Sequence, residues 1–186
     1  RSGLYMASAD EIYIKVIGKG GHGAHPHQNI DPVYIAAQII TQLQSVVSRH
    51  AKPSIPSVLS IGKVIANGAT NIIPNEVYME GTFRTYDENW RNEAHSLIKK
   101  IGEETALMHG AKCEIEVRKG YPFLKKDEDL TSQTMNWAKE YLGKDNVEEL
   151  ELWPAGEEFA YYSQEIPASF YRLGIRNQSK FDQTML

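Results

Sequence analysis

The chain has 186 residues, of which 41% are hydrophobic and 24% charged, and its formal net charge is −4. This balance is typical of a folded domain and excludes a disordered chain. Because Lys and Arg are scattered among acidic residues, we expect neither nucleic acid nor a membrane as a partner. No stretch approaches the ~18 apolar residues that cross a bilayer. The single cysteine, Cys113, forms no internal disulfide, which favours a reducing, cytoplasmic compartment.

The first elements in the chain are a strand and a helix. Residues 9–19 alternate β-branched and polar side chains, which predicts a strand with one buried face. After a loop rich in glycine and histidine, Asp31 precedes a proline and is a typical N-cap for a helix over residues 31–49. This helix is expected to bury the stripe Val33, Ala36, Ile40, Leu43 and Val47.

Two strands, a helix and a fourth strand follow. Residues 57–66 and 76–86 are predicted strands joined by a segment full of turn residues. Asp87 caps a second helix that ends at a His-Gly pair, and residues 111–121 alternate again as a strand. This order is that of a ferredoxin-like βαββαβ domain, with a four-stranded antiparallel sheet and both helices on one face. The open face or an edge of the sheet is then available to a second subunit.

The pattern changes in the last third of the chain. We expect helices over residues 127–142 and 156–164 and a single strand over residues 168–174. A lone strand forms no sheet by itself. This region is therefore expected to pack on the first domain or on a part of the protein outside the chain.

The stretch KGGHGAHPH, residues 19–27, places three histidines in a loop with three glycines. It is open to three interpretations: a structural turn, a zinc site made of all three histidines, or one projecting catalytic histidine. The zinc site is disfavoured because no Cys, Asp or Glu lies in the loop to complete a ligand set. His22 has glycine on both sides, so it is the candidate to donate a hydrogen bond to a developing oxyanion. His25 and His27 flank a proline and fit structural roles.

Several stretches together resemble one enzyme family. GKGGHGAHPH, GATNIIPNEVYMEGTFR and AGEEFAYY are similar to segments of the dinuclear-metal amidohydrolase and aminoacylase family of metallopeptidases, in particular its hippurate hydrolase and auxin-conjugate hydrolase branch. The resemblance covers nearly all of the chain. It implies an α+β fold in which residues 7–119 are a ferredoxin-like lid that forms a homodimer, and residues 120–186 are the last α/β segment of an incomplete catalytic domain.

The resemblance also implies roles for single residues. His22 corresponds to a lid histidine that enters the partner's active site and polarises the scissile carbonyl, and Asn71 to an asparagine that helps hold the substrate. Arg84 corresponds to the arginine that pairs with the substrate carboxylate, for which its planar fork is suited. A turn asparagine and a solvated strand arginine are the plainer alternatives. Glu157 and Glu158 correspond to a supporting acidic pair, although a helix start explains them equally well.

Two divalent metal ions, zinc, manganese or cobalt, are implied for the intact enzyme, with most ligands in a half upstream of this chain. The remaining ligand is a histidine shortly before a phenylalanine and an acidic pair. Phe181 and Asp182 are present, but no histidine follows His109. We therefore expect this fragment to bind no metal and to be inactive alone. In the intact enzyme, a metal-activated water is expected to cleave N-acyl amino acids, peptides or related amides.

Two other hypotheses remain open at this point. The chain is alternatively a non-catalytic dimerisation or binding module, in which the sheet is an association surface. A third hypothesis is an independent zinc protein built on the histidine loop. Metal-ligand clusters in the upstream sequence would favour the enzyme, and stoichiometric metal in this fragment would favour the zinc protein.

Overall fold

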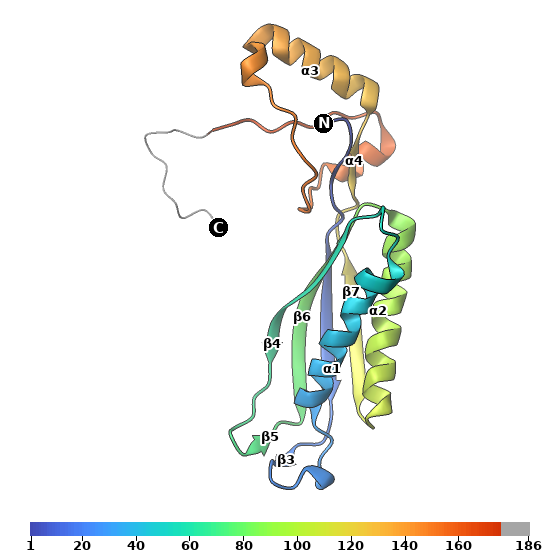
Figure 1. Ribbon diagram of the computed structural model, residues 1–186, viewed down its shortest axis with the longest axis vertical. Helices are drawn as coiled ribbons and strands as arrows, with labels where there is room; N and C mark the ends of the chain where they lie inside the picture. The colour runs from blue at the N-terminus through green and yellow to red at the C-terminus, as the bar shows by residue number, and fades with distance from the viewer. Residues whose placement is uncertain (176–186) are drawn as a thin grey trace.

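The computed structural model describes residues 1–175, so Phe181 and Asp182 lie outside the described range. Its longer part, residues 10–119, is called here the sheet unit (Figure 1). Its elements in chain order are β2 (Asp10–Ile17), β3 (Gly21–His22), a 3-10 turn (Pro26–Gln28), α1 (Pro32–Ser45), a π-helical turn (Val46–His50), β4 (Ser57–Ile65), β5 (Ile72–Ile73), β6 (Glu76–Thr85), α2 (Glu88–Met108) and β7 (Lys112–Lys119).

The four long strands form one antiparallel sheet in the order β4-β6-β2-β7. Both helices cover the same face, with α1 on β4, β6 and β2 and α2 chiefly on β7. The predicted α+β class and the ferredoxin-like βαββαβ order are confirmed. β3 and β5 form a small ladder at one end of the unit, which we call the tip (residues 20–29 and 67–75). The opposite end, where the chain leaves the unit, is the root (residues 8–10, 82–85 and 119–121).

The core of the sheet unit lies between the sheet and its helices, because alternate side chains of each strand face the same way. In β6, Val77, Met79 and Phe83 are fully buried, as the period-2 pattern predicts. Cys113 of β7 lies in this core, and burial raises the pKa of its thiol to about 12. The cysteine is therefore an unreactive hydrophobic residue, as expected.

The first helix buries a different stripe from the one predicted. Val33 is 43% exposed, and Ile40 and Val47 are only partly buried, whereas Ala36 and Leu43 are buried as expected. Nearly every residue of this segment is uncharged, so two adjacent faces of the helix both show apolar residues spaced by three and four positions. The sequence pattern therefore does not decide which of these two faces is buried. The side chains that are buried are Pro32, Ile35, Ala36, Ile39, Leu43 and Val46.

The helix ends follow the sequence closely. The side chains of Asp31 and Asp87 accept backbone hydrogen bonds of 2.9 and 2.8 Å in the first turns of α1 and α2, as predicted. After α2, Gly110 adopts a φ of 75°, a left-handed conformation that favours glycine at a helix end. The boundaries of α1 and α2 are therefore set by local sequence.

Residues 1–6 and 120–175 form a smaller part beyond the root, called here the C-terminal part. Its β1 and β8 pair antiparallel as a two-stranded sheet, with a small core of their own. No helix within residues 1–175 is both long and apolar enough to cross a membrane. The elements of this part are β1 (Gly3–Met6), β8 (Leu124–Lys126), α3 (Glu128–Leu142), a 3-10 turn (Lys144–Asn146) and α4 (Ala160–Glu165).

Two predictions for the C-terminal part need correction. The strand predicted at residues 168–174 is not formed: the Asp127 amide, just after β8, donates to the Ala168 carbonyl over 2.9 Å, but no strand ladder follows from it. The helix predicted from residue 156 begins only at Ala160, after a turn. Large apolar side chains are left exposed along the unpaired segment, namely Tyr171 (76%), Leu173 (77%) and Ile175 (90%).

Candidate functional site

β3 and β5 lie together at the tip of the sheet unit (Figure 1), and they carry His22 and, just before β5, Asn71. In the ladder of β3 and β5, His22 is opposite Ile72, and the Gly23 amide donates to the Asn71 carbonyl over 2.9 Å. Both side chains are exposed. The described residues form no hydrogen bond with His22 Nε2 or with the side-chain amide of Asn71. Two polar groups from distant parts of the sequence are thus presented side by side to whatever approaches the tip.

Hydrogen bonds around His22 hold the loop at the tip. The Ala24 amide donates to His22 Nδ1 over 3.1 Å, while the His25 amide and Asn29 Nδ2 donate to the His22 carbonyl over 2.9 and 3.1 Å. The ring of His25 lies 5.5 Å from that of His22 and 6.1 Å from that of His27, between centroids. Within residues 1–175, no three His, Cys, Asp or Glu side chains are placed to hold a metal ion. In this arrangement the three histidines are not placed as a zinc site.

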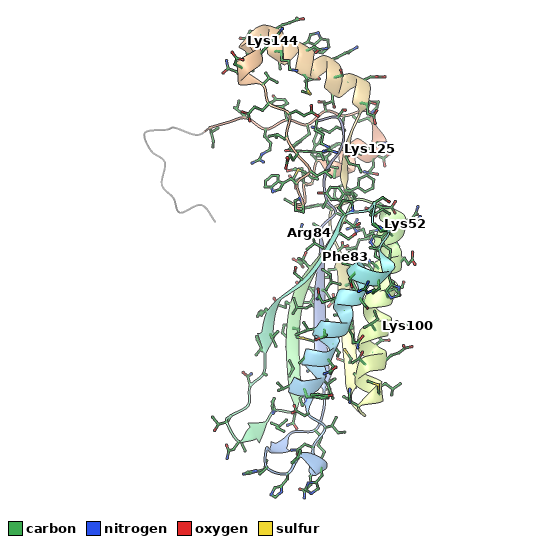
Figure 2. All side chains as sticks on the ribbon, in the orientation of Figure 1. Lys52, Phe83, Arg84, Lys100, Lys125 and Lys144 are labelled. Carbon is green, nitrogen blue, oxygen red and sulfur yellow. The ribbon has the colours of Figure 1, made fainter. Side chains whose placement is uncertain are left out.

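Arg84 lies at the root, beside the C-terminal part (Figure 2). Its side chain is partly buried, and its Nε donates to Thr82 Oγ1 over 3.0 Å. A Cβ added to Gly156 would lie 3.2 Å from Arg84 Nη1, so the guanidinium adjoins the turn before α4. No carboxylate among the described residues pairs with it. The outer N–H groups of Arg84 can therefore bind a ligand carboxylate.

The tip and the root are too far apart to hold one small substrate within a single protomer. β6 begins at Glu76, next to the tip, and reaches Arg84 near its other end. At roughly 3.3 Å per residue, this part of the strand spans about 26 Å. The structure brings His22 and Asn71 together and leaves Arg84 apart from both.

A buried ion-pair cluster lies at the root. Asp10 and Arg91 are 0% and 1% exposed, and Arg91 donates to Asp10 through both Nε and Nη2. His95 Nε2 lies 2.6 Å from Asp10 Oδ2. The Gly120 amide donates to Asp10 over 3.1 Å, and its carbonyl accepts from Arg91 Nη2 over 3.0 Å. Because Asp10 begins β2 and Gly120 follows β7, the cluster joins both segments that connect the sheet unit to the C-terminal part.

The donors in this cluster determine the charge of Asp10. Burial, the largest influence, would raise its pKa, but hydrogen bonds from Arg91 and His95 outweigh burial and lower the pKa from 3.8 to about 2. The carboxylate is therefore ionised at neutral pH. Its role is to hold the root together rather than to transfer a proton.

The acidic pair Glu157 and Glu158 lies in the turn before α4. Glu157 is partly buried and its Oε1 accepts from the Phe159 amide over 3.1 Å, while Glu158 is exposed. Both residues lie before the N-cap Phe159, and no acidic residue lies in the first turn of α4, so the pair does not occupy the helix start considered from the sequence. Through Gly156, the same turn adjoins Arg84, so the acidic pair lies near the root and not near His22.

The sequence analysis predicted neither the ion-pair cluster at the root nor the contact between Asn29 and His22. Asp10 shares its strand face with Ile12, where a carboxylate is unexpected, and Arg91 shares the buried face of α2 with Ala94. An acidic residue on the buried face of β2 and a basic residue on the buried face of α2 could have predicted the ion pair at the root. Asn29 gave no such signal, because its contact with His22 depends on how the loop folds back.

The comparisons with known proteins agree with this fold. Residues 8–109 match the family profile of the M20 peptidase dimerisation domain. An N-acyl-L-amino acid amidohydrolase of Geobacillus stearothermophilus is 43% identical over 127 residues, which are 68% of this chain and 34% of that protein. Thermostable carboxypeptidase 2 of Saccharolobus solfataricus is 34% identical over 181 residues, which are 97% of this chain and 45% of that protein.

A solved structure gives the same result. A dinuclear metal-binding M20 peptidase from Bacillus subtilis is 30% identical and superposes with a TM-score of 0.69, over 90% of this chain and 41% of that protein. The chain thus spans less than half the length of these relatives. The residues described here do not form a dinuclear centre of their own. The chain belongs to the M20 peptidase family of hydrolases, and it carries that family's dimerisation domain.

Proposed function

We propose that residues 7–119 are the lid and dimerisation domain of a metal-dependent amidohydrolase, and that residues 120–186 are the last segment of its catalytic domain. The observation that carries this proposal is the separation of His22 and Asn71 at the tip from Arg84 at the root. One substrate can meet all three side chains only if two protomers contribute to each site.

The edges of the sheet favour a homodimer formed through β4. Five of the eight residues of β7 are charged, whereas β4 has a single charged residue, Lys63, among nine. Charged side chains on an edge strand discourage pairing with another chain. On β4, in contrast, Val58 and Val64 are 41% and 52% exposed. β4 is therefore the edge suited to a partner.

The helix beside this edge supports the same interface. α1 and the turn after it contain no charged side chain from Pro32 to Ser48, whereas α2 carries seven charged residues. Val33 and Tyr34 on the outer side of α1 are 43% and 52% exposed. An uncharged helix surface next to an uncharged strand edge is typical of the centre of an interface.

A two-fold axis through β4 would bring the tip of one protomer to the root of its partner. β4 runs from Ser57, opposite Thr85 at the root, to Ile65, near the tip. When two copies of this strand pair antiparallel, the end of each lies beside the start of the other. His22 and Asn71 of one protomer then approach Arg84 of the other.

The chemistry of these side chains suits an amide substrate that carries a carboxylate. Arg84 would hold the carboxylate with two N–H groups, and His22 would donate to the carbonyl oxygen as negative charge develops on it. Asn71 offers both a donor and an acceptor to the same amide. N-acyl amino acids and peptides with a free C-terminus present both groups, and N-acyl-L-amino acids are the substrates named for one relative.

Within residues 1–175, no group of side chains is placed to hold a metal centre. We propose that two divalent ions, zinc, manganese or cobalt, are held by a part of the protein outside the described residues, and that this fragment alone is inactive. Glu157 and Glu158 would support the site from the turn next to Arg84. The unpaired Cys113 fits a reducing compartment, so we place the protein in the cytoplasm.

The proposal is tested with the full-length protein on paired substrates, an N-acyl amino acid and the same compound with its carboxylate capped as an amide. Arg84→Ala should raise KM for the acid about 10- to 100-fold and change KM for the capped amide little, because an ion pair is lost only with the acid. Equal effects on both substrates would refute the role of Arg84. Absence of hydrolysis over a broad panel of N-acyl amino acids and peptides, with each metal supplied, would favour the non-catalytic module.

A further inference from the structure

We infer that the backbone amide of Ala24 fixes the His22 ring in the tautomer with its proton on Nε2, and that Asn29 is a positioning residue for this histidine. The inference rests on the proposed role of His22, and it adds how the ring is prepared for that role. It is based on the hydrogen bonds within the loop at the tip.

The first step concerns the ring itself. The Ala24 amide lies 3.1 Å from His22 Nδ1. A backbone amide can only donate, so Nδ1 must accept and cannot carry a proton while this bond exists. A neutral imidazole has one N–H, and with Nδ1 as the acceptor that N–H is on Nε2. The contact therefore selects one of the two neutral tautomers.

The second step concerns the backbone that carries the ring. Asn29 Nδ2 and the His25 amide both donate to the His22 carbonyl, over 3.1 and 2.9 Å. A Cβ on Gly21 would collide with Asn29 Oδ1, so the Asn29 amide is packed directly against β3. On the other side, Gly23 is tied to Asn71 through its amide. These bonds fix the peptide groups before and after the turn, which keeps the Ala24 amide pointing at Nδ1.

The third step is the consequence for the proposed reaction. Within residues 1–175, Nε2 makes no hydrogen bond, so its N–H is available to donate to a group from outside the described residues. The developing oxyanion needs a donor at that position. The other tautomer would present a lone pair to the oxyanion and repel it. Because the Ala24 contact keeps the proton on Nε2, the ring needs no change of tautomer before it donates to the oxyanion.

The direct test is a two-bond proton–nitrogen spectrum of the full-length protein with ¹⁵N-labelled histidine, in which the His22 signals are assigned by their loss in His22→Ala. In the neutral form of the ring, we expect Nε2 to be protonated and Nδ1 to be unprotonated. A ring that is mainly protonated on Nδ1 would overturn the inference. This spectrum decides the matter even if a loop variant fails to fold.

Two variants of Ala24 separate the amide from the side chain. Ala24→Pro removes the N–H, and Ala24→Ser keeps it, so only the proline variant should populate the Nδ1-protonated form. We expect kcat to fall roughly 3- to 10-fold for Ala24→Pro with KM within about twofold, because a transition-state contact is weakened. Asn29→Ala should show the same spectral change to a smaller degree. Identical ring spectra for the proline and serine variants would contradict the inference.

The outcomes distinguish this inference from the proposed function. If His22→Ala left turnover unchanged while the spectrum showed the Nε2 proton, the catalytic role of His22 would be wrong and the tautomer assignment would stand. If His22→Ala abolished turnover while the ring was protonated on Nδ1, the role would stand and the tautomer assignment would be wrong.

Discussion

At the tip of the sheet unit, His22 and Asn71 are exposed and held by backbone hydrogen bonds of a glycine-rich loop, whereas at the root Asp10 and Arg91 are fully buried and paired. The tip contributes little apolar burial, so changes there should alter chemistry and leave stability nearly intact. The root joins both connections to the C-terminal part, so changes there should cost stability first. A buried, ion-paired root with an exposed tip fits the proposal that the tip reaches into a neighbour's site.

The largest expected effect is at the root. Arg91→Ala leaves Asp10 buried without its main partner, and we expect the free energy of unfolding to fall by about 3 to 5 kcal/mol. Denaturant titration of the full-length protein measures this loss. Arg118→Ala is the matched control, since both side chains of its pair with Glu116 are more than half exposed and the pair should contribute far less to stability. Equal losses for the two arginines would contradict the account of the root.

The next effect is at the tip. His22→Ala in the full-length protein should lower kcat by ~10² to 10³ on N-acyl amino acids, because a donor to the oxyanion is removed. The midpoint of thermal unfolding and the metal content should stay unchanged, since the side chain is exposed. Steady-state kinetics and calorimetry of the same preparations check both parts. A variant that unfolds early would mean that the tip also has a structural role.

The free energy of unfolding is expected to depend on pH through Asp10 at the root. The pKa of Asp10 is lower in the folded chain, at about 2, than its ordinary value of 3.8. Its contribution is therefore present above pH 3.8 and is lost as the pH falls towards 2, with a total of about 2 kcal/mol. Urea titrations at several pH values measure this slope. Asp10→Asn should reduce the slope, and an unchanged slope would show that other carboxylates cause it.

The smallest effect concerns the proposed interface. Val64→Lys places a charge on the exposed edge of β4, and we expect the dimer dissociation constant to rise about tenfold. Light scattering over a dilution series measures the change. Glu116→Lys on β7, the other edge, is the control and should leave the dissociation constant unchanged. The reverse result would place the interface on β7.

The sequence was sufficient for the fold of the sheet unit because its signals are local. Alternation in β6 and the capping residues Asp31 and Asp87 each act within a few residues. The buried stripe of α1 was predicted one face away, since an almost uncharged helix offers two equivalent faces. The strand at residues 168–174 was wrong, because a strand depends on a neighbour that local sequence does not reveal.

The candidate site was harder to predict from the sequence than the fold was. His22, Asn71 and Arg84 were chosen through a resemblance, and their roles stay predictions. What no pattern indicated was their distribution between the tip and the root, because it depends on the direction of β6 through the sheet. The Ala24 contact with His22 was equally hidden, since any residue except proline supplies a backbone amide.

The central claim is that each site combines the tip of one protomer with the root of its partner. Full-length His22→Ala and Arg84→Ala variants can be mixed under conditions that exchange subunits and assayed with the acid substrate well below KM, where each variant alone is weakly active. The account predicts that activity returns to about a quarter of the unaltered level, since half of the dimers are mixed and each has one intact site. If exchange is verified and the mixture stays as inactive as the separate variants, the shared site is contradicted.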